Sequence, residues 1–198
     1  MKRNKFLYVG ISTIILGFLL ILFTGYQMEQ VNKKIKTPPT QPIDRIISVK
    51  PNKKYVEGEK IGTIIFSSLK EYIPIYEGTT SSVLAKGAGH YSESALPGER
   101  ENHVIISGHR DTYFKSLKLL NEKDLISVET SKGTFTYRIK KFSIVSADND
   151  TILTPRSKPI LTLTTCYPFS FIGNAPKRFI VTAELTNDTT GITKNVSP

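Results

Sequence analysis

The sequence contains only one cysteine, Cys166, in 198 residues. One thiol cannot form a disulfide within the chain, which excludes the small secreted scaffolds that disulfides hold together. No group of His, Cys and Asp residues has the spacing of a zinc site, so we expect no metal and no cofactor. A free cysteine is usually either a buried small hydrophobic residue or a reactive thiol, and only its surroundings can distinguish the two.

Acidic residues are scarce, with 17 Asp and Glu against 27 Lys and Arg, and the net charge is +10. The positive charge is spread along the chain, and no known nucleic-acid-binding signature accompanies it. We therefore expect no nucleic-acid partner. The charge suits a bacterial surface, where the wall and the lipid headgroups are anionic. Tryptophan is absent, yet 39% of the residues are apolar, which is enough for a buried core.

Charge is also absent from residues 6–26 (FLYVGISTIILGFLLILFTGY). A helix of this length spans about 31 Å, close to the thickness of a bilayer core. A cleaved signal peptide is the alternative, but its apolar region is shorter and ends at a small-residue cleavage site, and neither feature is present. We predict a transmembrane anchor at 6–26. Residues 1–5, with Lys2, Arg3 and Lys5, would form a cytoplasmic tail, and the body of the protein would face outward after a single crossing.

The remainder divides into a linker at 27–57, a globular domain at 58–187 and a flexible tail at 188–198. The linker contains TPPTQP at 37–42, which favours an extended conformation. Short helices are expected at 81–86 and 112–120, the second capped by Asp111, and a hairpin turn at 131–133. Many short strands with few helices indicate a mostly β domain, either a sandwich or a closed barrel. The predicted strands are 61–66, 73–76, 103–107, 125–129, 135–145, 160–165 and 179–185.

Cys166 ends a strand whose residues alternate between apolar and small polar side chains (ILTLTTC, 160–166). The alternation predicts one buried face with Leu161 and Leu163, and places Cys166 on the opposite, accessible face. Arg178 begins the next strand, on the face opposite Phe179. If the two strands pair in antiparallel fashion, Arg178 lies beside Cys166.

His109 follows the β run 103–107 in a turn that begins with Gly108. Catalytic side chains collect in loops at strand ends, and the proton affinity of histidine lies near neutral pH. A cysteine nucleophile needs a base or cation that favours its thiolate and a donor for the negative charge of its intermediate. His109, Cys166 and Arg178 supply one group of each kind. Each alone has an ordinary interpretation: a structural histidine, a buried thiol and a solvated surface arginine.

Together these residues resemble the sortase family of cysteine transpeptidases. TLTTC at 162–166 is similar to the TLxTC signature, GHRD at 108–111 is similar to the segment around the catalytic histidine, and Arg178 falls where the catalytic arginine does. The continuation YPF at 167–169, with no membrane span after it, is most similar to class D. Pilus-building class C members usually add such a span and an inhibitory lid.

The resemblance implies a closed eight-stranded β-barrel and a transpeptidation in a Gram-positive-type bacterium. A sorting signal of LPxTG type on a surface protein is cleaved after Thr, leaving a thioester on Cys166. An amine of a lipid-linked peptidoglycan precursor then resolves the thioester. His109 would exchange protons with the leaving and incoming amines, and Arg178 would steady the carbonyl oxygen. Some members bind calcium, but the sequence shows no clear carboxylate cluster for it, and calcium remains open.

Three further residues are candidates for supporting roles. Asp111 could orient the segment around His109, although helix capping is the more ordinary role for it. Arg110 rivals Arg178 as the stabilising cation, but its adjacency to His109 turns its side chain elsewhere. Thr165 precedes the nucleophile within the signature. His90 and His103 are not expected to be catalytic.

Three other functions remain as alternatives. A surface cysteine protease would use the same acyl-enzyme and hydrolyse it. A non-catalytic, anchored β-domain would bind a wall polymer and would not need Cys166. An L,D-transpeptidase is disfavoured because the Ser-x-Gly sequence that usually precedes its cysteine is absent at Cys166.

Overall fold

The computed structural model describes residues 3–38, 54–99, 103–149, 159–170, 173 and 175–190. Residues 39–53 of the predicted linker and 191–198 of the predicted tail lie outside these ranges. The chain forms two compact units, divided between Lys34 and Ile35. The first consists of a helix and the second of the β domain.

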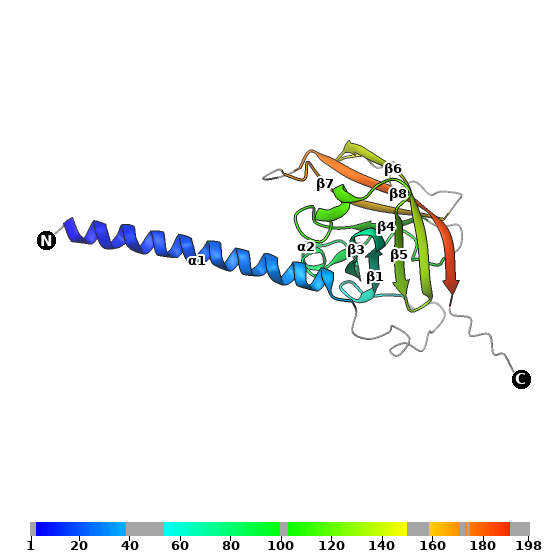
Figure 1. Ribbon diagram of the computed structural model, residues 1–198, viewed down its shortest axis with the longest axis horizontal. Helices are drawn as coiled ribbons and strands as arrows, with labels where there is room; N and C mark the ends of the chain where they lie inside the picture. Colours follow the sequence, from blue (N-terminus) through cyan, green and yellow to red (C-terminus); the bar gives the residue numbers. More distant parts are fainter. Residues whose placement is uncertain are drawn as a thin grey trace, which may run out of the picture. The chain divides into compact units, whose positions relative to one another are not determined.

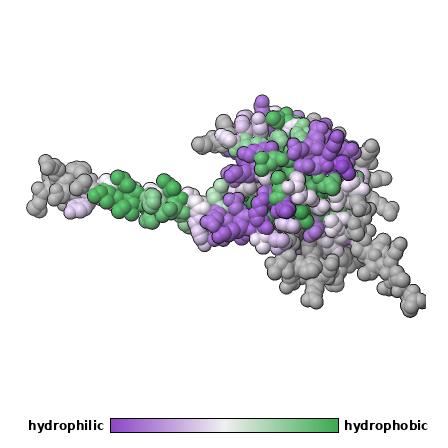
Figure 2. Space-filling model, viewed as in Figure 1, coloured by the Kyte–Doolittle hydropathy of each residue, from purple (hydrophilic) through white to green (hydrophobic). Residues whose placement is uncertain are grey.

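Helix α1 (Arg3–Lys36) contains the predicted anchor. It is long and apolar enough to cross a membrane, and none of its most apolar window is buried by protein (Figure 2). The helix continues ten residues beyond the predicted span, into the first part of the predicted linker. Residues 27–36 contain neither glycine nor proline, and Glu29 pairs with Lys33 one turn later at 2.8 Å. The helix ends shortly before Pro38, as expected for a residue that cannot continue it.

The second unit is a closed barrel of eight strands in the order β1-β2-β3-β4-β7-β8-β6-β5 (Figure 1). Neighbouring strands are antiparallel except for the pairs β2–β3 and β4–β7. The closed eight-stranded fold implied by the resemblance is therefore confirmed. The strands are β1 (Lys60–Phe66), β2 (Glu71–Glu77), β3 (Ala88–His90), β4 (His103–Ser107), β5 (Leu125–Thr130), β6 (Gly133–Ser146), β7 (Ile160–Tyr167) and β8 (Lys177–Thr190).

Seven of these strands coincide with the predicted runs, and β3 was missed. Its three residues, AGH, contain no apolar alternation, so only pairing with β2 and β4 makes them a strand. Gly89 is required there, because a Cβ at this position would lie 2.4 Å from the carbonyl oxygen of Gly78. The predicted hairpin is confirmed, with Thr130 paired to Gly133 across the turn.

The predicted helices are shorter than expected. The first is α2 (Ser81–Leu84), and the second contains only the 3₁₀ helix η3 (Lys115–Leu119). A further 3₁₀ turn, η2 (Ser67–Leu69), joins β1 to β2. The prediction that Asp111 caps a helix is wrong, because η3 begins later, after Phe114, and has no side-chain cap. The side chain of Asp111 is exposed.

The core is formed by buried apolar side chains from every strand, β3 contributing Ala88, together with Phe114 and Leu117 after β4. On β7 these are Leu161 and Leu163, as predicted. The expectation that only one face of β7 is buried is wrong, since Thr162 on the other face is only 3% exposed. Parallel pairing with β4 places β7 inside the sheet, where both faces are usually covered.

Candidate active site

The register of β7 and β8 places Cys166 directly opposite Arg178. Directly opposed residues of an antiparallel pair lie on the same face, so the thiol and the guanidinium leave the sheet on the same side. Both residues are half-buried. The antiparallel return of the chain that the sequence analysis assumed is therefore confirmed.

The end of β4 lies beside the same end of β7. Their parallel register pairs Ser107 with Thr164, and the Gly108 amide donates to the Thr164 carbonyl at 3.1 Å. Continuing this register by two residues brings the backbone of His109 level with that of Cys166. His109 is exposed. The ends of three neighbouring strands, β4, β7 and β8, thus bring the three predicted catalytic residues to one end of the barrel.

Thr165 joins two of these strand ends. Its Oγ1 donates a hydrogen bond of 2.7 Å to the carbonyl oxygen of Gly108, and its side chain is only 3% exposed. This bond fixes the residue before His109 to the residue before Cys166. Its geometry supports a positioning role for Thr165, which the sequence analysis had named as a supporting residue.

The turn that carries His109 is packed onto the core. Phe114 donates its amide to the His109 carbonyl at 3.0 Å, and its ring lies 6.2 Å from that of Phe66. Gly108 is needed beneath this ring, because a Cβ there would lie 2.6 Å from the Phe114 side chain. The glycine therefore allows the turn to lie close to the interior.

Two arginines hold the loop between β7 and β8. Arg110 Nη2 donates to the Gly173 carbonyl at 3.0 Å, whereas Arg178 Nη1 donates to the carbonyls of Ala175 and Lys177 at 3.2 and 3.1 Å. Arg178 remains opposite Cys166 while it makes these bonds. Both arginines bond the loop, and it is the position of Arg178 directly opposite Cys166 that favours Arg178 over Arg110 as the cation next to the nucleophile.

The other two histidines have structural partners. His90 Nδ1 lies 2.8 Å from Glu77 Oε2 in the interior, and His103 Nε2 lies 2.6 Å from Thr162 Oγ1. His103 begins β4, at the end of the strand away from His109. These contacts agree with the expectation that neither is catalytic.

An aromatic cluster behind the site was missed. Phe179 stacks on Phe142 at 5.7 Å, and Phe169 and Tyr167 complete the group at 5.2 and 6.4 Å from Phe179. These residues come from three neighbouring strands, β6, β8 and β7, and from the loop after β7, so no local pattern in the sequence reveals them. Tyr167 directly follows Cys166, and the cluster therefore supports the end of β7 from the opposite face.

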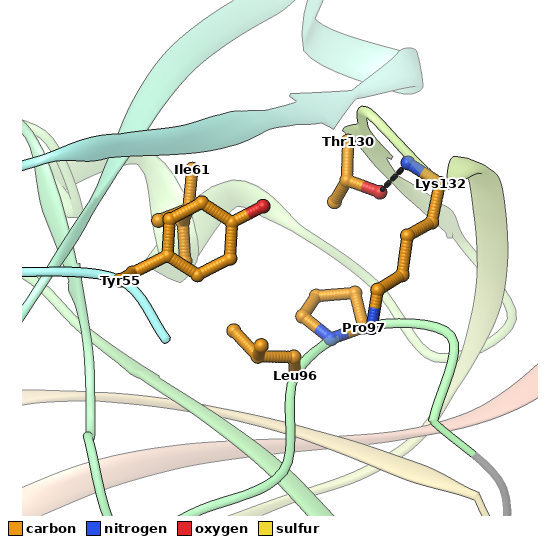
Figure 3. Close-up of a pocket in the computed structure, with 6 residues that line it drawn as sticks. All are labelled: Tyr55, Ile61, Leu96, Pro97, Thr130 and Lys132. Carbon is orange, nitrogen blue, oxygen red and sulfur yellow. Dashed lines mark hydrogen bonds between the residues drawn. The ribbon is translucent and has the colours of Figure 1, made fainter. Parts of the chain in front are cut away.

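Neither a metal site nor the hollow found in the barrel involves the predicted catalytic residues within the described ranges. Within the described ranges, no group of three or more His, Cys, Asp and Glu side chains could hold a metal ion. A hollow at the hairpin end of the barrel lies between Tyr55 and Leu96 on one side and Lys132 on the other (Figure 3). It contains none of the predicted catalytic residues. The expected absence of a cofactor remains a prediction.

Comparison with known proteins tests the resemblance. Residues 65–186 match the family model described as the sortase domain. The chain belongs to the sortase family. It is 42% identical to sortase D of Bacillus subtilis (strain 168) over 174 residues, which are 83% of this chain and 87% of that protein. The predicted similarity to class D sortases is thereby confirmed.

Solved sortase structures share the barrel. The catalytic domain of B. anthracis SrtD is 40% identical, with a TM-score of 0.59 over 71% of this chain and 97% of that one. Sortase C of Clostridium perfringens, solved with the C-terminal cell wall sorting motif, is 28% identical, with a TM-score of 0.62 over 67% of this chain and 74% of that one. The chain is therefore a cysteine transpeptidase by family, and the non-catalytic alternative is discarded.

Proposed function

We propose that this sortase cleaves an LPxTG-like sorting signal after its Thr through a thioester on Cys166. An amine of a lipid-linked peptidoglycan precursor then replaces the thiol, which links the surface protein to the wall through an amide. One observation carries the proposal: Cys166 faces Arg178 across β7 and β8, and β4, which ends two residues before His109, pairs with β7 as far as Thr164.

The chemistry follows from the groups that meet there. The Cys166 sulfur attacks the Thr carbonyl carbon as its thiolate, and Arg178 donates to the oxygen that becomes negative. The C–N bond breaks as His109 gives a proton to the leaving amine. The incoming amine attacks the thioester and passes a proton to His109, and the thiolate leaves. The proton that His109 gives to the leaving amine is thus replaced by one from the incoming amine.

The supporting residues act through Cys166, His109 and Arg178. Thr165 holds the His109 turn against the Cys166 strand through its bond to Gly108. Arg110 holds the β7–β8 loop at Gly173, two residues before the Ala175 carbonyl that receives Arg178. Asp111 is exposed, so its side chain could contact the loop or the substrate only from the solvent side. We assign no catalytic step to it.

The location of the enzyme follows from α1. The apolar helix would anchor the chain in the membrane of a Gram-positive-type cell by a single crossing. Lys2, Arg3 and Lys5 favour a cytoplasmic amino terminus, which places the barrel outside, where wall precursors and exported proteins meet.

The test uses the full chain in detergent with a panel of sorting peptides and an amine acceptor. Mass spectrometry should detect a thioester on Cys166 and a peptide joined to the amine, and both should vanish in Cys166→Ala. His109→Ala and Arg178→Ala should lose turnover with unchanged circular dichroism, whereas Arg138→Ala, an exposed arginine on β6, should not. Hydrolysed peptide with no amine adduct would support the protease alternative instead. Near-normal turnover in either active-site variant would remove that residue from its role.

A further inference from the structure

Thr164 carries a buried hydroxyl that is unpaired within the part of the chain that the structure describes. Its side chain is 9% exposed, and its Oγ1 meets neither a donor nor an acceptor among the described residues. Its neighbours in the signature differ, because the hydroxyls of Thr162 and Thr165 bond to His103 and Gly108. Buried polar groups are nearly always paired, so an unpaired one calls for an explanation.

The position of the Thr164 hydroxyl on β7 supplies an explanation. Thr164 is two residues before Cys166 on β7, and alternation along a strand places both side chains on the same face. Its partners across the two neighbouring strands are Ser107 on β4 and Ile180 on β8. Ser107, Cys166 and Arg178 are half-buried, so Thr164 lies where the covered part of the face meets its accessible part.

The spacing identifies the kind of group that would pair with it. Two residues along a strand span about 6.6 Å, and an extended peptide advances by the same distance in two residues. A peptide whose scissile carbonyl lies at Cys166 therefore brings a group about two residues away next to Thr164. In an LPxTG-like signal the residue two before the Thr is proline, which has no N–H and offers only its carbonyl oxygen.

We propose that Thr164 is a specificity residue whose hydroxyl donates to a backbone carbonyl of the acyl part of the bound sorting peptide. The proposal rests on the proposed function and refines it. The free enzyme leaves the hydroxyl unpaired, and the peptide pairs it. Substrate analogues that lack this carbonyl would be rejected because they would leave the hydroxyl unpaired in the complex.

Two variants separate this role from a structural one. Thr164→Val keeps the shape and β-branching and removes the hydroxyl, whereas Thr164→Ser keeps the hydroxyl. Thr182→Val is the matched control, because Thr182 is on the same face of β8, opposite Thr162 and one pair farther from Cys166. Each variant is prepared as the full chain in detergent, next to wild type and Cys166→Ala.

Thermal unfolding is measured first. Thr164→Val should raise Tm by about 2–4 °C, since an unpaired buried hydroxyl is replaced by a methyl group. Single-turnover thioester formation with Leu-Pro-x-Thr-Gly peptides should meanwhile fall about tenfold, with Thr164→Ser within about threefold of wild type and Thr182→Val unchanged. The partition of the thioester between water and amine should not change, because both routes share the acyl part.

A purely structural hydroxyl would give the opposite pattern, with a lower Tm in Thr164→Val. That result, or wild-type rates of thioester formation in this variant, would overturn the role of Thr164 alone. Absence of turnover by wild type with every peptide, or turnover that survives in Cys166→Ala, would refute the proposed function and this refinement with it.

Discussion

The bond from Thr165 to Gly108 gives a prediction that can be worked through from the structure. Thr165→Val removes a buried hydroxyl donor of matched shape and leaves the Gly108 carbonyl without it. Loss of the bond and stranding of a buried acceptor together cost about 1–3 kcal/mol of unfolding free energy. The barrel should remain folded, because a domain of this size typically has a stability of about 5–15 kcal/mol.

Activity should fall more than stability. The Gly108 carbonyl immediately precedes His109, so its release lets the imidazole move relative to Cys166. Misplacement by about 1 Å can cost about a hundredfold in rate, and we expect kcat to fall about 10- to 100-fold. Thr165→Ser should restore both the bond and the rate.

The assay pairs urea unfolding with single-turnover thioester formation at a temperature well below Tm. A rate that stays at the wild-type level while stability drops would show that the bond only supports the fold. A variant of unchanged stability would show that the bond contributes nothing. Either result would refute the positioning role of Thr165.

Three further predictions concern Gly108, the two arginines that bond the β7–β8 loop, and Tyr137. Gly108→Ala should lower the unfolding free energy by about 1–3 kcal/mol, because its Cβ would press on the Phe114 ring; denaturant curves that overlay wild type would contradict this. Arg110→Lys and Arg178→Lys should each reduce kcat/KM, and the double variant should lose less than the product of the two, since Arg110 acts through the loop that holds Arg178; strict additivity would disprove this coupling. Burial raises the pKa of Tyr137 well above its usual value near 10, so the unfolded chain ionises first. Stability should be intact below about pH 10 and fall above it by up to about 1.4 kcal/mol per pH unit, and Tyr137→Phe should reduce that fall in unfolding titrations.

Most strands could be predicted from the sequence, as could the position of Cys166 next to Arg178. Both depend on the local alternation of apolar and polar residues. Apolar residues at every second position mark a half-buried strand, and the short separation of 166 from 178 favours an antiparallel return. The position of β3 could not be inferred in this way, since AGH is a strand only through its neighbours. The aromatic cluster around Phe179 depends on side chains brought together by the closed barrel.

The error at Asp111 came from the use of a one-residue signal. Asp111 was assigned to a helix cap because Asp favours that position, yet Phe114 packs into the core and the 3₁₀ helix starts only after it. The predicted anchor ends at Tyr26, where the apolar run ends, and its bounds stay a prediction. Helix propensity and the pairing of Glu29 with Lys33 extend α1 beyond the apolar run.

The adjacent residues Thr164 and Thr165 show what the signature TLTTC cannot reveal by itself. The two have the same chemistry, yet alternation sends one hydroxyl to the face of Cys166 and the other to a bond with Gly108. Replacing either by valine should slow thioester formation. The same substitution should stabilise the barrel at 164, where an unpaired hydroxyl is removed, and destabilise it at 165, where a bond is lost. Opposite changes in Tm with a common loss of rate would be expected only if one hydroxyl is reserved for substrate and the other positions the catalytic histidine.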